Sequence, residues 1–185
     1  MDVFCGEPPA IDSFSLVAYV PQPLGGFIQR IRQEIQSGCT TRSHLTFLPP
    51  RLLATPLEQI RRQLEEGLQS QNAFRVELSD VQVFPVSNAI HLTLSAGLVE
   101  TIKIHEVLHR NGLTCEESFA YHPHVTLAQD LDPRNVPAAM DLAKIRWQEY
   151  SESREFPIDH VTLVQHKPEG WITLAEFALR VPVSV

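Results

Sequence analysis

Short apolar runs with a two-residue period alternate with stretches of helical period along this chain, and their order constrains the fold more than any other feature. Strands are predicted at 13–20, 42–48, 74–84, 89–95, 122–129, 156–165 and 171–181, and helices at 27–38, 56–70, 99–110 and 133–147. The order β-α-β-α-β-β is followed by α-β-α-β-β, as if one motif containing βαβ were used twice. The sequence therefore predicts an α+β fold of two pseudo-symmetric lobes, each an antiparallel sheet with helices on its outer face, around a central cleft.

The length and the ends of the chain indicate how it is organised. A chain of 185 residues suits one compact domain, so we expect a single bilobal domain at 12–185 after a loose N-terminal arm at 1–11. No apolar stretch approaches the ~20 residues of a membrane span, and the N-terminus lacks the pattern of a secretion signal. Three widely spaced cysteines without a CxxC pair are expected to be free thiols. We expect a cytoplasmic monomer with no membrane partner.

The charge balance limits the kinds of partner. The chain has 15 Lys and Arg against 22 Asp and Glu, and its formal net charge is −7. Extended coating of nucleic acid is disfavoured, because that affinity comes mainly from neutralising phosphates with a broad basic surface. A small phosphate-bearing substrate in a locally basic cleft remains compatible with this composition.

Histidine and threonine recur two residues apart. Four of the eight histidines are followed in this way, in His44-Leu45-Thr46, His91-Leu92-Thr93, His124-Val125-Thr126 and His160-Val161-Thr162. Chance placement would give about one such pair, although threonine's preference for strands raises that number. On a strand, each segment presents an imidazole and a hydroxyl on the same face. A strand with one polar face gives the same pattern without any chemistry.

Two of the four segments occupy matching places in the two halves. His44 and His124 each lie on a strand that follows a helix and leads through a proline-containing connection into another helix. Lobes packed face to face would set these two segments opposite each other, which predicts a site with two acid-base groups. His91 and His160 form a rival pair, ranked lower because the strand of His91 continues a polar face and the strand of His160 fits an open edge.

The segments His44-Leu45-Thr46-Phe47 and His124-Val125-Thr126-Leu127 resemble the paired HxT motifs of the two-histidine (2H) phosphoesterase superfamily, specifically its 2′-5′ RNA ligase-like branch. The resemblance covers nearly the whole chain. It implies a bilobal fold, metal-independent chemistry on 2′,3′-cyclic phosphates or 2′-5′ linkages of RNA termini or small cyclic nucleotides, and catalytic roles for His44, Thr46, His124 and Thr126. Many members carry a basic residue shortly after the second motif, where this chain has Gln129-Asp130.

The chemistry explains why such residues would be needed. Opening a cyclic phosphodiester removes a proton from the attacking oxygen and delivers another to the departing oxygen. Two histidines, with an ordinary pKa of about 6.5, supply both roles, each worth about 10²–10⁴-fold in rate. Two threonine hydroxyls donate to the non-bridging oxygens. No metal and no cofactor is required, and either histidine can be the base.

Further residues are candidates for binding the substrate. Arg42 shares the strand face of His44, Arg51 lies just after that strand, and Arg134 begins the helix after His124. The guanidinium fork suits phosphate. Tyr121 and Phe84 are candidates for stacking on a base, although aromatic residues at strand ends are more often part of a core.

Two other functions remain open at the level of sequence. One is an RNA-end-binding protein that keeps the cleft without turnover. The other is a zinc hydrolase, because His105, Glu106 and His109 form a His-Glu-x-x-His segment. Such an enzyme needs a third ligand, for which the downstream candidates are His122, His124 and Glu116. The amphipathic helix and the regular two-lobe pattern argue against it.

Overall fold

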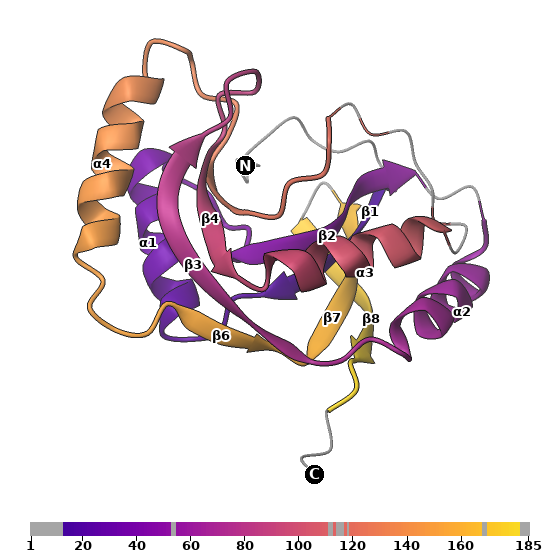
Figure 1. Ribbon diagram of the computed structural model, residues 1–185. Coiled ribbons are helices and arrows are strands. Elements are labelled where there is room, and N and C mark those ends of the chain that lie inside the picture. The colour runs from indigo at the N-terminus through magenta and orange to yellow at the C-terminus, as the bar shows by residue number, and fades with distance from the viewer. Residues whose placement is uncertain are drawn as a thin grey trace.

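The computed structural model describes residues 13–52, 55–110, 113, 117, 119–167 and 170–181. The elements run in the predicted order of strands and helices with one additional strand (Figure 1). They are β1 (Ser13–Tyr19), α1 (Leu24–Ile35), β2 (His44–Leu52), α2 (Leu57–Leu68), β3 (Phe74–Val83), β4 (Ile90–Ala96), α3 (Leu98–Arg110), β5 (Val125–Ala128), α4 (Val136–Gln148), β6 (Glu155–Ile158), β7 (His160–Lys167) and β8 (Gly170–Ala178).

The strands form one antiparallel sheet in the order β6-β3-β4-β5-β2-β1-β7-β8. It consists of two four-stranded halves, β6-β3-β4-β5 and β2-β1-β7-β8. The halves meet where β2 pairs with β5, in a short contact whose register sets Leu45 against Val125. The predicted α+β class and antiparallel pairing are confirmed.

The two halves of the sheet do not correspond to the N-terminal and C-terminal halves of the sequence. The β3–β4 hairpin follows α2 in the chain but pairs through β4 with β5, and the β7–β8 hairpin returns to pair with β1. The lobes therefore exchange their hairpins. The prediction that each lobe is built from consecutive elements is wrong on this point, because local periodicity shows where a strand lies but not which strand it pairs with.

The single strand predicted at 156–165 is wrong, because the structure has two strands there, β6 and β7. β6 pairs with β3, whereas β7 pairs with β1, so the chain crosses from one half of the sheet to the other at Asp159. The crossing separates two apolar runs that read as one in the sequence.

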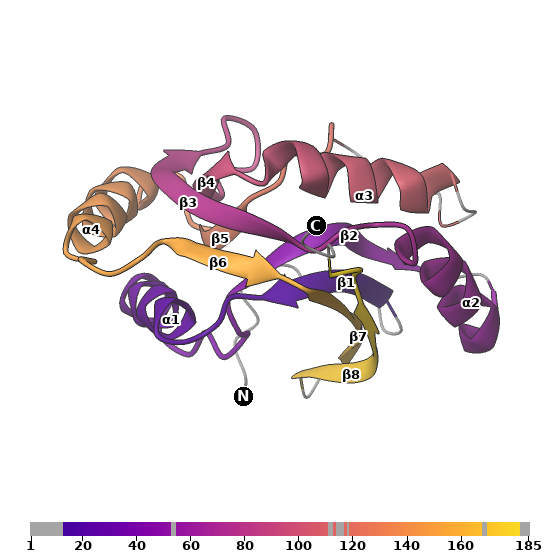
Figure 2. The same cartoon turned by 60° about the horizontal axis from the view of Figure 1, so that its bottom comes forward.

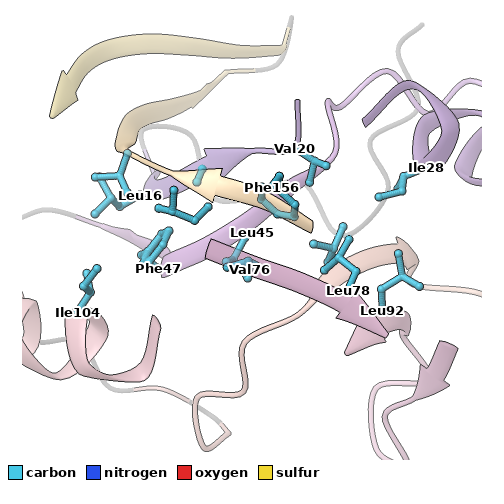
Figure 3. Packing of buried hydrophobic residues seen from close by; sticks show 14 of the residues in the cluster. Leu16, Val20, Ile28, Leu45, Phe47, Val76, Leu78, Leu92, Ile104 and Phe156 are labelled. Atoms are coloured by element: carbon cyan, nitrogen blue, oxygen red, sulfur yellow. The ribbon is translucent and has the colours of Figure 1, made fainter. Parts of the chain in front are cut away.

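The helices cover one face of the sheet with their apolar stripes. α1 and α4 pack against each other at one side of the molecule, and α2 packs against α3 at the other (Figures 1 and 2). Alternate strand residues, including Leu16, Leu45, Phe47 and Leu92, meet helix residues such as Ile104 in the core (Figure 3). Burial of this apolar surface is the main stabilising contribution to the fold.

Two expectations concern the ends and the cysteines. The arm predicted at 1–11 lies outside the described residues. Cys39 is buried and disulfide-bonded, so the expectation of three free thiols is wrong; Cys5 and Cys115 lie outside the described residues. Among the helices of the described chain, we find none with the length and apolar character of a membrane span.

Candidate active site

Alternation along β2 and β5 brings the four residues predicted to be catalytic onto one face of the sheet. Leu45 and Val125 are paired and both side chains lie in the core. Their sequence neighbours therefore point to the opposite face. These neighbours are His44, Thr46, His124 and Thr126, and all four are half-buried.

The antiparallel register arranges these side chains as a square. It sets His44 across from Thr126 and Thr46 across from His124. The imidazoles thus occupy one diagonal and the hydroxyls the other. Diagonal neighbours across two strands are about 7–8 Å apart at Cα, which leaves room for one tetrahedral phosphate between the side chains.

Both imidazoles are oriented by the same kind of hydrogen bond. The His44 Nδ1–H donates to the carbonyl of Arg42 (2.7 Å), and the His124 Nδ1–H donates to the carbonyl of His122 (2.6 Å). A nitrogen that contacts a carbonyl oxygen must carry the proton. In the neutral rings, therefore, each Nε2 is left as an acceptor.

The surroundings favour the neutral form of both rings. The pKa of His44 is lowered to about 3, mainly by desolvation. The hydrogen bond to the Arg42 carbonyl raises this pKa, and the charges of Arg32, His124 and His166 lower it further. Desolvation also lowers the pKa of His124, and its bond to the His122 carbonyl partly opposes this. Both rings are therefore neutral near pH 7 until an anionic substrate binds, whose charge favours the protonated form of a nearby imidazole.

An aromatic side chain stands next to each of these histidines. The Trp171 ring lies 4.7 Å from that of His44, and the Phe84 ring lies 4.9 Å from that of His124. Each is stacked on a second imidazole, His166 at 4.5 Å and His91 at 3.8 Å. The two halves of the sheet therefore contribute matching arrangements of two imidazoles and one aromatic ring.

Sequence reasoning missed part of this arrangement. The sequence predicts a solvent face for the strand of His91 and an open edge for the strand of His160, which continues to His166. Both interpretations are wrong, because His91 and His166 are only 1% and 3% exposed and β7 is paired on both sides. His166 is hydrogen-bonded to Ser15 (3.0 Å). The alternation that placed His44 and His124 on one face applies equally to His91, which is paired with Thr126, so register was the missing signal.

The rival histidine pair is not brought together. His91 lies beside His124, with ring centroids 5.3 Å apart. His160, in contrast, is exposed and bonded to Asp159. The two belong to different halves of the sheet, at β4 and β7.

The predicted cationic residues have different surroundings. Arg42 is exposed and its guanidinium lies 3.8 Å from the centroid of the Tyr19 ring, whose residue is paired with His44. Arg134 is exposed and paired with Asp132. Sequence reasoning missed Arg32 of α1, which is 3% exposed and donates to the carbonyl of residue 41 (2.7 Å).

Arg51 lies on β2 itself, and Tyr121 is half-buried beside that strand. Arg51 is buried and donates to the Leu113 carbonyl (2.6 Å) and to Glu117 (2.9 Å), so its fork is occupied by protein groups. The Tyr121 hydroxyl donates to the Thr46 carbonyl (2.6 Å). The geometry thus favours supporting roles for both over the substrate contacts predicted from sequence.

The His-Glu-x-x-His segment does not assemble as a zinc hydrolase requires. His105 and His109 approach a third potential ligand, Glu117, which was not among the candidates from sequence; of those candidates, Glu116 lies outside the described residues. Glu106, which would be the base, is exposed and forms an ion pair with an arginine one turn further along α3. The catalytic part of this alternative is therefore disfavoured.

A two-lobed α+β fold with one histidine-threonine pair from each half defines the class of two-histidine phosphoesterases. The chain belongs to the 2′-5′ RNA ligase superfamily, whose family model matches residues 20–170. This membership supports an enzyme of the phosphoesterase type.

Individual relatives agree with this membership. The Bacillus mycoides "Putative phosphoesterase" is 27% identical over 161 residues, 81% of this chain and 91% of that protein. Escherichia coli LigT, solved with 3′-AMP, matches with a TM-score of 0.66 at 15% identity over 91% of this chain and 98% of that one. TT0787 of Thermus thermophilus gives a TM-score of 0.64 at 17% identity over the same shares. At such identities these two structures show the fold alone.

Proposed function

We propose that this protein is a phosphoesterase that opens 2′,3′-cyclic phosphates or cleaves 2′-5′ linkages at RNA ends by two-histidine acid-base catalysis. The observation that carries the proposal is the placement of His44 and His124 on one diagonal of the β2–β5 pair, each with Nδ1 fixed by a carbonyl. The family membership supports it, as does the complex of a structural relative with 3′-AMP.

The reaction needs one neutral and one protonated imidazole. Nε2 of the neutral ring takes the proton of the attacking water as the new oxygen–phosphorus bond forms. The other ring gives its Nε2 proton to the oxygen that leaves as the old bond breaks, so protons and charge balance. In ligation, a ribose hydroxyl takes the place of water and gives its proton to the same ring. Cleavage of the 2′-5′ linkage is the reverse reaction, so in it the roles of the two rings are exchanged.

Thr46 and Thr126 lie on the other diagonal and stabilise the negative charge of the phosphoryl group. Their hydroxyls donate to the non-bridging oxygens, whose charge redistributes in the transition state. Among the predicted substrate-binding residues, Arg42 keeps a solvent-facing guanidinium on the side of His44. We assign it the first contact with the anionic substrate, and we assign Arg134 no contact because an aspartate two residues earlier already holds it.

The test is hydrolysis of a 2′,3′-cyclic nucleotide in the presence of EDTA. The proposal predicts turnover that survives chelation and is lost in His44→Ala and in His124→Ala. His160→Ala is the matched control, since it removes an exposed histidine of an HxT segment that lies away from the proposed site. Tight binding of the cyclic phosphate without product would instead identify an RNA-end-binding protein. Complete loss of turnover in EDTA while the chain stays folded would overturn the metal-independent mechanism.

A further inference from the structure

A second group of chemically active side chains lies between α3 and the segment that leads to β5. His105 and His109 are one turn apart on α3, and Glu117 faces both of them. The Glu117 carboxylate is 3.5 Å from His105 Nε2 and 3.0 Å from His109 Nε2. One ligand atom from each residue lies within 4.8 Å of the others, a spacing that suits ligands around one ion.

The hydrogen bond made by His105 leaves two acceptor atoms facing each other, one on His105 and one on Glu117. Its Nδ1–H donates to the Phe47 carbonyl (2.7 Å), so Nε2 of the neutral ring carries a lone pair. This lone pair faces a carboxylate oxygen of Glu117 at 3.5 Å, and the two acceptors repel each other unless a proton or a metal ion lies between them. An Nδ1–H bonded to a carbonyl is also how metal-binding histidines are commonly oriented.

Arg51 completes the surroundings of the cluster. It donates to Glu117 Oε1 (2.9 Å) and lies 3.4 Å from His109 Nε2. The same oxygen of Glu117 contacts His109, whereas Oε2 faces His105. The guanidinium thus orients the Glu117 carboxylate, as hydrogen-bonding partners of metal-binding carboxylates do. Its positive charge also lowers the affinity of the cluster for a metal ion.

We propose that His105, His109 and Glu117 form a structural zinc site, separate from the phosphoester chemistry. Two imidazole nitrogens and a carboxylate are ligands that Zn²⁺ accepts, with water in the fourth position. Mg²⁺ and Ca²⁺ require mostly oxygen ligands, so the two histidines select against them. The site does not depend on the proposed enzymatic function.

The position of the site indicates what the ion would stabilise. His105 holds the Phe47 carbonyl, and the Tyr121 ring is stacked on His105 at 3.7 Å while its hydroxyl holds the Thr46 carbonyl. These bonds follow β2 beyond Leu45, where its pairing with β5 ends. An ion bound to His105 would therefore stabilise the part of β2 that carries Thr46, through these backbone contacts and without contact with the substrate.

The experiment is equilibrium dialysis of the full chain against Zn²⁺, with competition by a chromophoric chelator, and thermal unfolding with and without the ion. We expect one bound equivalent of Zn²⁺ and, at about 100 times the dissociation constant, a rise in Tm of about 5–10 °C. His109→Gln and Glu117→Gln should each weaken binding by at least about tenfold. Mg²⁺ should neither bind nor raise Tm.

Two control variants make the result specific. His160→Gln removes an exposed histidine beside a carboxylate and should leave zinc binding unchanged. Because the imidazoles of the candidate active site also offer nitrogen ligands, the test includes the double variant His44→Ala/His124→Ala, which should keep the one bound equivalent. Loss of zinc in that double variant, full retention in both His109→Gln and Glu117→Gln, or no binding by the wild-type chain would each overturn the proposal.

Discussion

Two backbone carbonyls decide how the proposed catalytic rings are presented. In each HxT segment the histidine Nδ1–H donates to the carbonyl two residues earlier, at Arg42 and at His122. The pattern could be found in the sequence because the residue types and the alternation of a strand are local properties. The stacking of Trp171 and Phe84 beside these rings could not, because it depends on which hairpin packs next to which strand.

Tyr121 is expected to position Thr46 through its backbone. Tyr121→Phe removes the donor to the Thr46 carbonyl and keeps the ring on His105. Because one hydrogen bond is worth about 0.5–1.5 kcal/mol, we expect kcat to fall about threefold to tenfold with little change in KM. Steady-state kinetics on a cyclic nucleotide measure this.

A matched control for that variant is Tyr150→Phe. The Tyr150 hydroxyl is buried and has no hydrogen-bond partner in the described chain, so its removal should leave the kinetics unchanged. An unchanged kcat in Tyr121→Phe would show that the bond does not position Thr46.

Arg32 is expected to contribute to the pH dependence of the reaction, in addition to the desolvation of His44. Its buried guanidinium has no carboxylate within ion-pair distance among the residues described, and its charge lowers the pKa of His44. Arg32→Gln keeps a donor for the Thr41 carbonyl and removes the charge, so the pKa of His44 should rise and the pH optimum of kcat/KM should move upward. We also expect a KM increase of about twofold to tenfold for the anionic substrate.

Arg32→Lys retains the charge and provides the comparison. Its pH optimum should match that of the wild-type enzyme, even if its stability is reduced. Identical pH profiles in the wild type and in Arg32→Gln would contradict an electrostatic role for this residue.

At the scale of elements, the positions of strands and helices could be predicted because each has its own apolar period. The pairing could not, since the exchange of the β3–β4 and β7–β8 hairpins joins residues far apart in the chain. The division of 156–165 at Asp159 is a consequence of that exchange, because β6 and β7 end in different halves. The prediction of a two-histidine site was unaffected, since β2 and β5 remain neighbours.

The junction between β4 and α3 depends on a single glycine. Gly97 has a φ of +81°, and a Cβ there would lie 2.6 Å from the Arg75 carbonyl oxygen and 2.7 Å from Val76. Gly97→Ala should therefore lower the free energy of unfolding by about 1–3 kcal/mol, from backbone strain and overlap together. Denaturant unfolding measures the change.

Gly170→Ala separates these two causes. Its φ of +129° is also unfavourable for alanine, but a Cβ there has open space around it. The loss of stability should thus be smaller than in Gly97→Ala. An equal or larger loss at Gly170 would show that the close contact at Gly97 contributes nothing.

At the scale of the whole molecule, buried neutral histidines couple stability to pH. Desolvation lowers the pKa of both His91 and His166 to about 4. In the unfolded chain these groups titrate near a pKa of about 6.5, so below that pH the unfolded state binds more protons than the folded state. The stabilisation is fully present above about pH 6.5 and is lost as pH falls toward 4.

Unfolding experiments between about pH 7.5 and pH 5 test this coupling. Each of the two histidines should remove up to about 2 kcal/mol of stability over that range. In His166→Gln the slope of stability against pH should be shallower than in the wild type. A slope that is unchanged by this substitution would show that the pKa of His166 is the same in the folded and unfolded states.

The central claim is that His44 and His124 act on the same phosphorus atom, one as base and one as acid. The most direct measurement compares His44→Ala and His124→Ala on a cyclic nucleotide and on a phosphodiester with a nitrophenolate leaving group, which departs without a proton. We predict that both variants lose turnover of the cyclic nucleotide and that the activated diester restores turnover in only one of them. Full activity of either variant on the cyclic nucleotide, or equal rescue of both by the activated diester, would contradict the account.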